Sequence, residues 1–155
     1  MTVIVAGTPA PEFRLVQGDG EEFTQADLTG HGTVLVFYPF AFSPTCTDQL
    51  QLYEPIIAEL AEKGARLYGV SCDSPYAQKA FTEKLGVSSE QLSDFEPKGA
   101  ASAAFGALHP GGFSERALVI LDADGVVRWS YQGENPGVLP PPDLLREGIA
   151  AALGS

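Results

Sequence analysis

Residues 33–71 read TVLVFYPFAFSPTCTDQLQLYEPIIAELAEKGARLYGVS and contain two apolar runs with a helical pattern between them. The runs, residues 33–38 and 66–71, are continuous and rich in strand-forming residues, which is typical of strands covered on both faces. Between them, apolar residues recur at helical spacing from Leu50 to Leu60, and Lys63-Gly64 ends the pattern. We therefore expect a strand, a helix and a second strand. A right-handed crossover makes the two strands parallel neighbours.

The segments on either side of this unit are shorter. Towards the N-terminus, residues 12–16 and 22–24 flank a polar turn and predict a small hairpin. Towards the C-terminus, the pattern predicts a helix that begins at Ser74-Pro75, a mixed region of short strand, loop and one helical turn over residues 90–108, an antiparallel hairpin of residues 117–121 and 126–131, and a last helix over residues 143–153. This order predicts an α/β protein with a thioredoxin-like fold: a mixed central sheet flanked by helices, with an N-terminal β-hairpin.

Composition narrows the possible classes of protein. The 155 residues are enough for one domain, expected to span residues 1–155. The net charge of −11 repels polyanions, so nucleic acid and anionic membrane surfaces are not expected partners. The first residues have no basic segment typical of a signal peptide, and no apolar run is long enough to span a membrane. Two cysteines are too few for a disulfide framework, so we expect reduced cysteines and a cytoplasmic protein.

Cys46 falls in the first turn of the helix predicted after residues 44–45. The unpaired amides and the positive end of the helix dipole favour an anion there, and the thiolate is the nucleophilic form of cysteine. The hydroxyl of Ser43 can donate to a ligand oxygen, and Pro39, Phe40 and Phe42 are candidates for a wall that excludes water. A buried structural cysteine is the alternative interpretation of Cys46.

Five segments together resemble peroxiredoxins. The spacing Pro39-x-x-x-Ser43-x-x-Cys46 resembles the active-site motif of that family, which ends in the peroxidatic cysteine. The other segments that resemble the family are residues 7–15, residues 69–74, residues 92–94 with Gly106, and residues 115–122. The resemblance implies that Arg116, which in isolation would fit a strand-end arginine, lies beside Cys46. Residues 93–100 are most similar to the one-cysteine branch typified by alkyl hydroperoxide reductase E.

The chain departs from the family pattern at three positions. Ser43 replaces the commoner threonine and keeps the hydroxyl. Gln49 stands where many members have glutamate. Cys72 is a candidate resolving thiol, but its place at the end of a buried strand favours a core cysteine, and the one-cysteine mechanism uses an external thiol instead.

The resemblance implies a thiol-dependent peroxidase that reduces hydrogen peroxide and small organic hydroperoxides through a cysteine sulfenic acid. Its expected partners are the peroxide, an external thiol or a thioredoxin- or glutaredoxin-like reductant, and a second copy of the chain in a homodimer. No cofactor or metal is expected: a glycine-rich phosphate loop is missing, and His31 and His109, which we expect to face solvent, have no metal-ligand spacing with the cysteines.

Two other functions stay open at this point. A disulfide oxidoreductase on the same fold would need a C-x-x-C motif, but the chain reads Cys46-Thr47-Asp48-Gln49. A holdase or redox-regulated binding module would use the same surface without catalysis.

Overall fold

Strand β3 (Thr33–Phe37) is buried along its whole length at the centre of a mixed sheet with strand order β2-β1-β5-β4-β3-β6-β7. The computed structural model describes residues 3–135 and 137–154. The other strands are β1 (Arg14–Gln17), β2 (Glu22–Thr24), β4 (Arg66–Ser71), β5 (Glu90–Ser93), β6 (Ala117–Leu121) and β7 (Val127–Gln132). The helices are α1 (Pro44–Glu62), α2 (Pro75–Leu85), α3 (Ala100–Ala104) and α4 (Pro142–Leu153), with a 3-10 turn, η1, over Gln25–Leu28.

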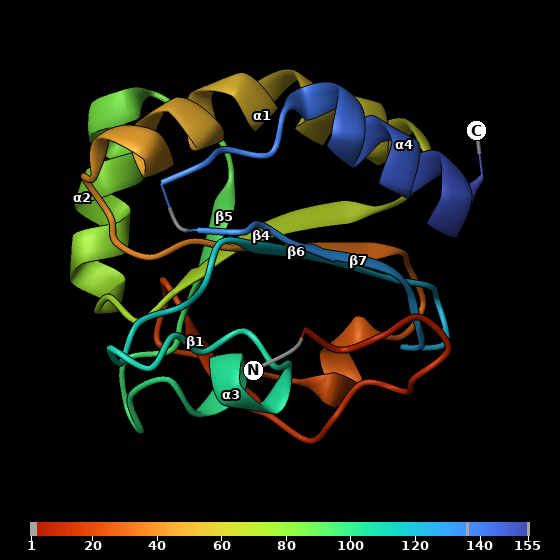
Figure 1. Ribbon diagram of the computed structural model, residues 1–155, viewed down its shortest axis with the longest axis horizontal. Helices are drawn as coiled ribbons and strands as arrows, with labels where there is room; N and C mark the ends of the chain where they lie inside the picture. Colours follow the sequence, from red (N-terminus) through yellow and green to blue (C-terminus); the bar gives the residue numbers. More distant parts are fainter. Residues whose placement is uncertain (1–2, 136, 155) are drawn as a thin grey trace.

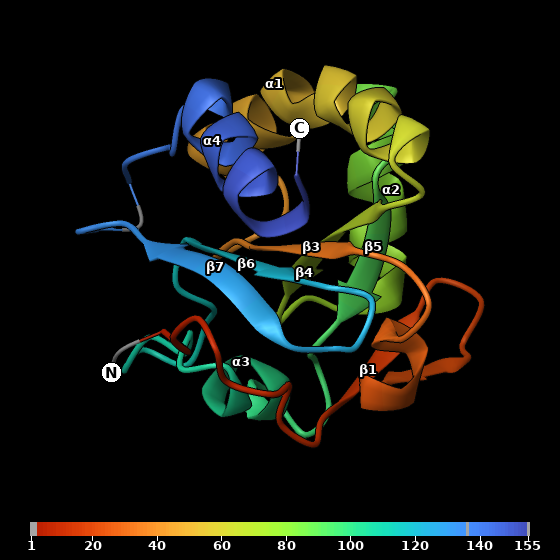
Figure 2. The ribbon, with the colours of Figure 1, turned by 90° about the vertical axis from the view of Figure 1, so that its right-hand side faces the viewer.

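The sheet separates two layers. Helices α1, α2 and α4 cover one face, and α3 and the N-terminal segment lie on the other (Figures 1 and 2). Because side chains alternate along a strand, Val34 and Val36 of β3 pack under α1 and α4, whereas Leu35 and Phe37 pack in the cluster on the α3 side. No helix among the described residues is both long and apolar enough to cross a membrane.

The register of the central strands brings three chain segments to one edge of the sheet. Strand β3 runs parallel to β4, with Phe37 opposite Val70, and antiparallel to β6, with Phe37 opposite Ala117. The end of β3, the end of β4 and the beginning of β6 therefore meet. These parallel and antiparallel neighbours confirm the arrangement expected from the sequence, as does the thioredoxin-like fold of the molecule.

Most element boundaries lie close to the predicted ones. The first hairpin strand covers residues 14–17 instead of 12–16, and β7 covers residues 127–132 instead of 126–131. The mixed region resolves into the short strand β5 and the helical turn α3, as expected. The 3-10 turn η1 was not predicted, although the side chain of Asp27 caps the backbone N–H of Thr24 at its start.

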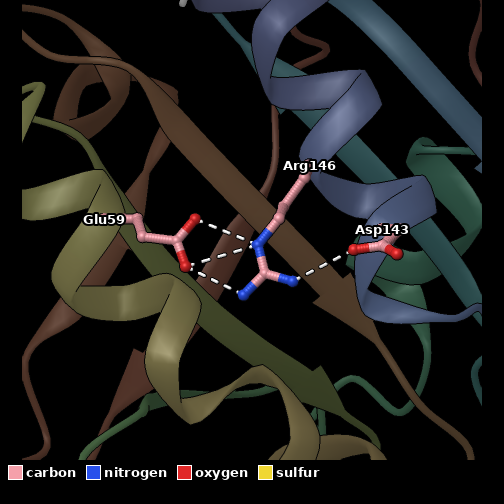
Figure 3. A network of polar contacts seen from close by, with 3 residues as sticks. All are labelled: Glu59, Asp143 and Arg146. Carbon is pink, nitrogen blue, oxygen red and sulfur yellow. Dashed lines mark hydrogen bonds and ion pairs between the residues drawn. The ribbon is translucent and has the colours of Figure 1, made fainter.

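Helix α4 is held on α1 and β7 by contacts of different kinds. Arg146 of α4 donates to both carboxylate oxygens of Glu59 on α1 and also pairs with Asp143 one turn earlier (Figure 3). Gly148 lies directly against the ring of Trp129 on β7. The absence of a side chain at residue 148 thus allows the helix to approach the sheet closely.

Candidate active site

Cys46 is the third residue of α1, and its side chain is buried. The loop between β3 and the helix turns at residues 39–43, and Pro44 begins the helix at a position where its missing N–H costs nothing. The loop is tied to the segment after β4, because the Ala41 N–H donates to the Asp73 carboxylate at 2.8 Å. The sulfur therefore lies at the amino end of a helix, where the helix dipole favours an anion.

Arg116, the residue before β6, reaches the sulfur of Cys46. Its Nη2 lies 3.2 Å from Sγ, and its Nη1 donates to Oε1 of Gln49 at 2.6 Å. The arginine is only 3% exposed, so the positive charge acts on the sulfur with little screening by solvent. The expected proximity of Arg116 to Cys46 is confirmed, across 70 residues of sequence.

Ser43 is the residue immediately before α1, and its hydroxyl makes no helix-capping hydrogen bond. Within the described part of the chain, Oγ is buried and has no hydrogen-bond partner. A buried hydroxyl without a partner is unfavourable, and this one is available to donate to a ligand oxygen. Pro39, which is also buried, begins the turn that carries Ser43 to this position.

The two aromatic residues expected to shield the thiol are both about half-exposed. Phe40 and Phe42 are 47% and 48% exposed. Phe42 has a positive φ of 72°, an uncommon conformation for a side chain of this size, and its ring packs against Phe81 with centroids 5.1 Å apart. The wall predicted from Pro39, Phe40 and Phe42 stays a prediction, and the buried side chains that cluster with Cys46 are those of Tyr38, Leu50 and Phe81.

Gln49 and Tyr53 join the site through hydrogen bonds. Gln49 is buried and donates from Nε2 to the Tyr53 hydroxyl at 3.4 Å, and that hydroxyl donates to the carbonyl of Pro140 at 2.7 Å. In the sequence, Gln49 stands out only as a departure from the family pattern, and Tyr53 is only one of the apolar residues at helical spacing between Leu50 and Leu60. One feature of the sequence could have identified Gln49: it is a polar residue on the face of a helix that is expected to be buried, and a buried polar side chain usually has a hydrogen-bond partner.

Cys72 follows β4 but is directed away from α1. Its Sγ lies 3.6 Å from Ser114 Oγ, which in turn lies 2.7 Å from the hydroxyl of Ser102 on α3. Burial raises the pKa of the Cys72 thiol, although the Ser114 hydroxyl opposes the shift. Both cysteines are free thiols. Cys72 thus lies on the opposite side of the sheet from the layer that holds Cys46.

The two histidines were expected to face solvent, but both are partly buried. His31 is partly buried, and its Nδ1 lies 3.1 Å from the carbonyl of Gly32. The ring of His109 stacks on Phe113 at 4.2 Å, and its Nδ1 accepts from the Gly111 N–H. Among the described residues, no group of three His, Cys, Asp or Glu side chains is placed to hold a metal ion.

The arrangement can support nucleophilic chemistry at sulfur. Arg116 donates to the Cys46 sulfur, and the Ser43 hydroxyl and the first-turn amides can donate to an oxygen bound beside it. The same donors would stabilise negative charge that develops on that oxygen.

Comparisons with known proteins agree with this chemistry. Residues 6–130 match the model of the AhpC/TSA family. A protein described as a peroxiredoxin in the rubredoxin operon of Clostridium pasteurianum is 30% identical over 81% of this chain and 77% of its own length. Alkyl hydroperoxide reductase E of Mycobacterium tuberculosis is 28% identical over 94% of this chain and 95% of its own. The crystal structure of AhpC from Enterococcus faecalis superposes with a TM-score of 0.83 at 26% identity, covering 96% of this chain and 92% of that one.

Proposed function

The chain belongs to the AhpC/TSA family and is a peroxiredoxin, a thiol-dependent peroxidase that reduces peroxides, and on this basis we propose that Cys46 is its peroxidatic thiolate. The observation that carries the assignment is the 3.2 Å contact between Arg116 Nη2 and Cys46 Sγ at the start of α1. The proposed substrates are hydrogen peroxide and small organic hydroperoxides, which suit a sulfur atom as buried as this one.

The first step is a displacement at oxygen. The Cys46 thiolate attacks one peroxide oxygen, the S–O bond forms as the O–O bond breaks, and sulfur supplies both electrons. The enzyme is left as a sulfenic acid, and the departing oxygen takes a proton to leave as water or an alcohol. The protein groups needed are those that bind two oxygens carrying partial negative charge. Arg116, the Ser43 hydroxyl and the backbone N–H of Cys46 are proposed for this role.

Pro39 is proposed to act through the shape of the loop. It is buried at the start of the turn and cannot donate a backbone N–H, so it contributes apolar surface instead of a hydrogen bond. That surface would keep bulk water away from the sulfur and from the two oxygens.

Peroxide consumption with excess dithiothreitol as the reductant tests the assignment. Cys46→Ser should abolish the activity, and Arg116→Ala should lower the rate of Cys46 oxidation about 10²-fold, as expected for the loss of one transition-state donor. Arg116→Lys is the matched control, because it keeps the charge but loses the planar fork that contacts sulfur and Gln49 together. Equal activity in the wild-type and Cys46→Ser proteins would overturn the proposal.

An external thiol is proposed to complete the cycle. One thiol condenses with the sulfenic acid, releasing water and forming a mixed disulfide, and a second thiol displaces Cys46 as thiolate. A small thiol or a thioredoxin- or glutaredoxin-like protein can supply both. The placement of Cys72 on the α3 side of the sheet, beside Ser114, supports a reductant from outside the chain.

We further propose a cytoplasmic homodimer in which residues 1–155 act as one domain. The single-domain proposal is supported by the sheet, whose strands come from residues 14–132 without a break in pairing. The dimer proposal is supported by the exposed apolar side chains of Phe40 and Phe42, in the loop before α1, and of Phe95, which follows β5. The cytoplasmic proposal is supported by the two free thiols and by the need for a thiol reductant.

A further inference from the structure

Three buried residues of α1 lie in one row along the helix. Cys46, Gln49 and Tyr53 are separated by three and four residues, which places them above one another on the same face. The first is the proposed nucleophile and the second contacts Arg116. The hydroxyl of the third, Tyr53, is joined to Arg116 through Gln49, which donates to that hydroxyl and accepts from the arginine.

The direction of each hydrogen bond in this row is determined by its chemistry. The carbonyl of Pro140 can only accept, so the Tyr53 hydroxyl donates its single proton to that carbonyl, at an O···O distance of 2.7 Å. The Tyr53 oxygen can then only accept, and it receives Nε2 of Gln49. This leaves Oε1 of Gln49 directed at Arg116, which can only donate. The donors therefore run in one direction from the active site to the backbone before α4.

Two physical facts make the Tyr53 hydroxyl a reliable anchor. Burial raises the pKa of Tyr53 to about 12, although the hydrogen bond with Gln49 and the charge of Arg116 oppose the shift, so the donated proton stays in place at any working pH. The Pro140 carbonyl belongs to the main chain, so the row ends on a fixed point. Without the hydroxyl, the amide N–H₂ of Gln49 would be buried without its acceptor. The hydrogen bond from Arg116 to Oε1 would then be the remaining one of the two described for this side chain.

We propose that Tyr53 is a positioning residue, which fixes Gln49 and through it holds the Arg116 guanidinium at the Cys46 sulfur. The inference rests on the proposed peroxidase function of Cys46. The neutral amide of Gln49 needs such an anchor, because only its oxygen can accept from arginine. If the amide turned over, its N–H₂ group would face the arginine instead. A glutamate at the same position would pair with arginine through two equivalent oxygens and would not depend on Tyr53.

The first measurement is the rate at which one equivalent of hydrogen peroxide oxidises Cys46, followed by rapid quenching and mass spectrometry. Tyr53→Phe removes one oxygen atom and should slow this step about tenfold, less than the loss of a whole transition-state donor. Tyr68→Phe is the control: Tyr68 is also a buried tyrosine but lies in the core cluster on the other face of the sheet, and its variant should react at the wild-type rate.

The decisive measurement repeats Tyr53→Phe in a Gln49→Glu background. With glutamate at residue 49, loss of the hydroxyl should change the rate by less than about twofold, because the carboxylate holds arginine unaided. Loss of the same factor in both backgrounds would show that Tyr53 only supports the fold, and would overturn the proposal, as would a Tyr53→Phe protein with the full rate. A wild-type protein whose Cys46 does not react would instead overturn the peroxidase assignment, and the positioning role with it.

Discussion

The hydroxyl of Ser43, three residues before Cys46, is buried without a hydrogen-bond partner in the described structure, which makes it a sensitive probe of function. Ser43→Ala should slow the oxidation of Cys46 by roughly 10- to 100-fold, because a donor to the peroxide oxygen is lost. The same change should leave the free energy of unfolding unchanged or slightly higher, since it removes an unsatisfied polar atom. Rapid-quench kinetics and urea unfolding measure the two effects.

Ser43→Thr is the control for that prediction. It keeps the hydroxyl and adds the methyl group found at this position in most of the family, so the rate should stay near that of the wild-type protein. A full rate in Ser43→Ala would contradict the assignment of Ser43 as a donor.

Cys72 offers a second prediction at the scale of a single residue. Burial raises the pKa of its thiol, so near neutral pH it stays protonated and unreactive. One equivalent of peroxide should add one oxygen to Cys46, and Cys72→Ala should turn over with dithiothreitol at the wild-type rate. Mass spectrometry under non-reducing conditions is the measurement. Quantitative formation of a Cys46–Cys72 crosslinked peptide would show that the two thiols meet and that Cys72 is a resolving residue.

At the scale of elements, the close approach of α4 to β7 depends on Gly148. Alanine in place of glycine inside a helix normally stabilises by about 1 kcal/mol. Here a Cβ would lie 2.6 Å from two ring atoms of Trp129, closer than Cβ atoms come to other heavy atoms, so the ring or the helix would have to shift. We expect Gly148→Ala to destabilise by about 1–3 kcal/mol, the usual cost of overpacking.

Urea unfolding of Gly148→Ala measures this balance. Ala151→Gly, at an exposed position of the same helix, measures separately how much the difference in helix propensity between alanine and glycine contributes to the free energy of unfolding. A Gly148→Ala protein more stable than the wild type would show that the helix and sheet separate at little cost.

The ion pair between α1 and α4 should contribute a pH-dependent term. Hydrogen bonds from Arg146 hold the pKa of Glu59 below its ordinary value of 4.5. A lowered carboxyl pKa in the folded state means that the pair stabilises above the ordinary value and that this stabilisation is lost as pH falls through the lowered one. Because both side chains are largely exposed, the effect should be small and should shrink in high salt.

Unfolding of Glu59→Gln as a function of pH tests the linkage. The variant should be slightly less stable than the wild type at neutral pH and equal to it in acid. Glu62→Gln, at an exposed position on the same helix, is the control. An equal difference at every pH would mean that the carboxylate charge is not the source of the effect.

Elements with strong local patterns could be predicted from sequence, and those that depend on distant partners could not. The pattern of apolar residues within each segment is enough to predict β3, β4 and the buried face of α1. Strand β5, reading EQLS, is short and partly polar, and its place between β4 and β1 depends on pairing with residues far away in sequence. The same holds for the site. Cys46 and Ser43 could be recognised from one local motif, whereas the hydrogen bonds from Gln49 to Tyr53 and from Tyr53 to Pro140 depend on the folded structure.

For the whole molecule, the proposed dimer gives a measurable prediction. Sedimentation at micromolar concentration should show a species of twice the 16.4 kDa chain mass. Phe40→Glu, which places a charge on the exposed apolar surface beside the site, should shift the protein towards monomer. The oxidation rate of Cys46 in that variant serves as a control for an intact site. A wild-type protein that sediments only as monomer would remove the dimer from the proposal.

The antiparallel pairing of β3 with β6 has a consequence for the history of each newly made molecule. Cys46 and Arg116 are 70 residues apart, and β6 must join the sheet before the arginine can reach the sulfur. A nascent chain that has left the ribosome only as far as α2 carries the thiol without its partner. The thiol therefore gains its arginine contact late in synthesis, only after β6 has joined β3. In a refolding experiment, peroxide sensitivity would return with the closing hairpin and would report the arrival of the last strands.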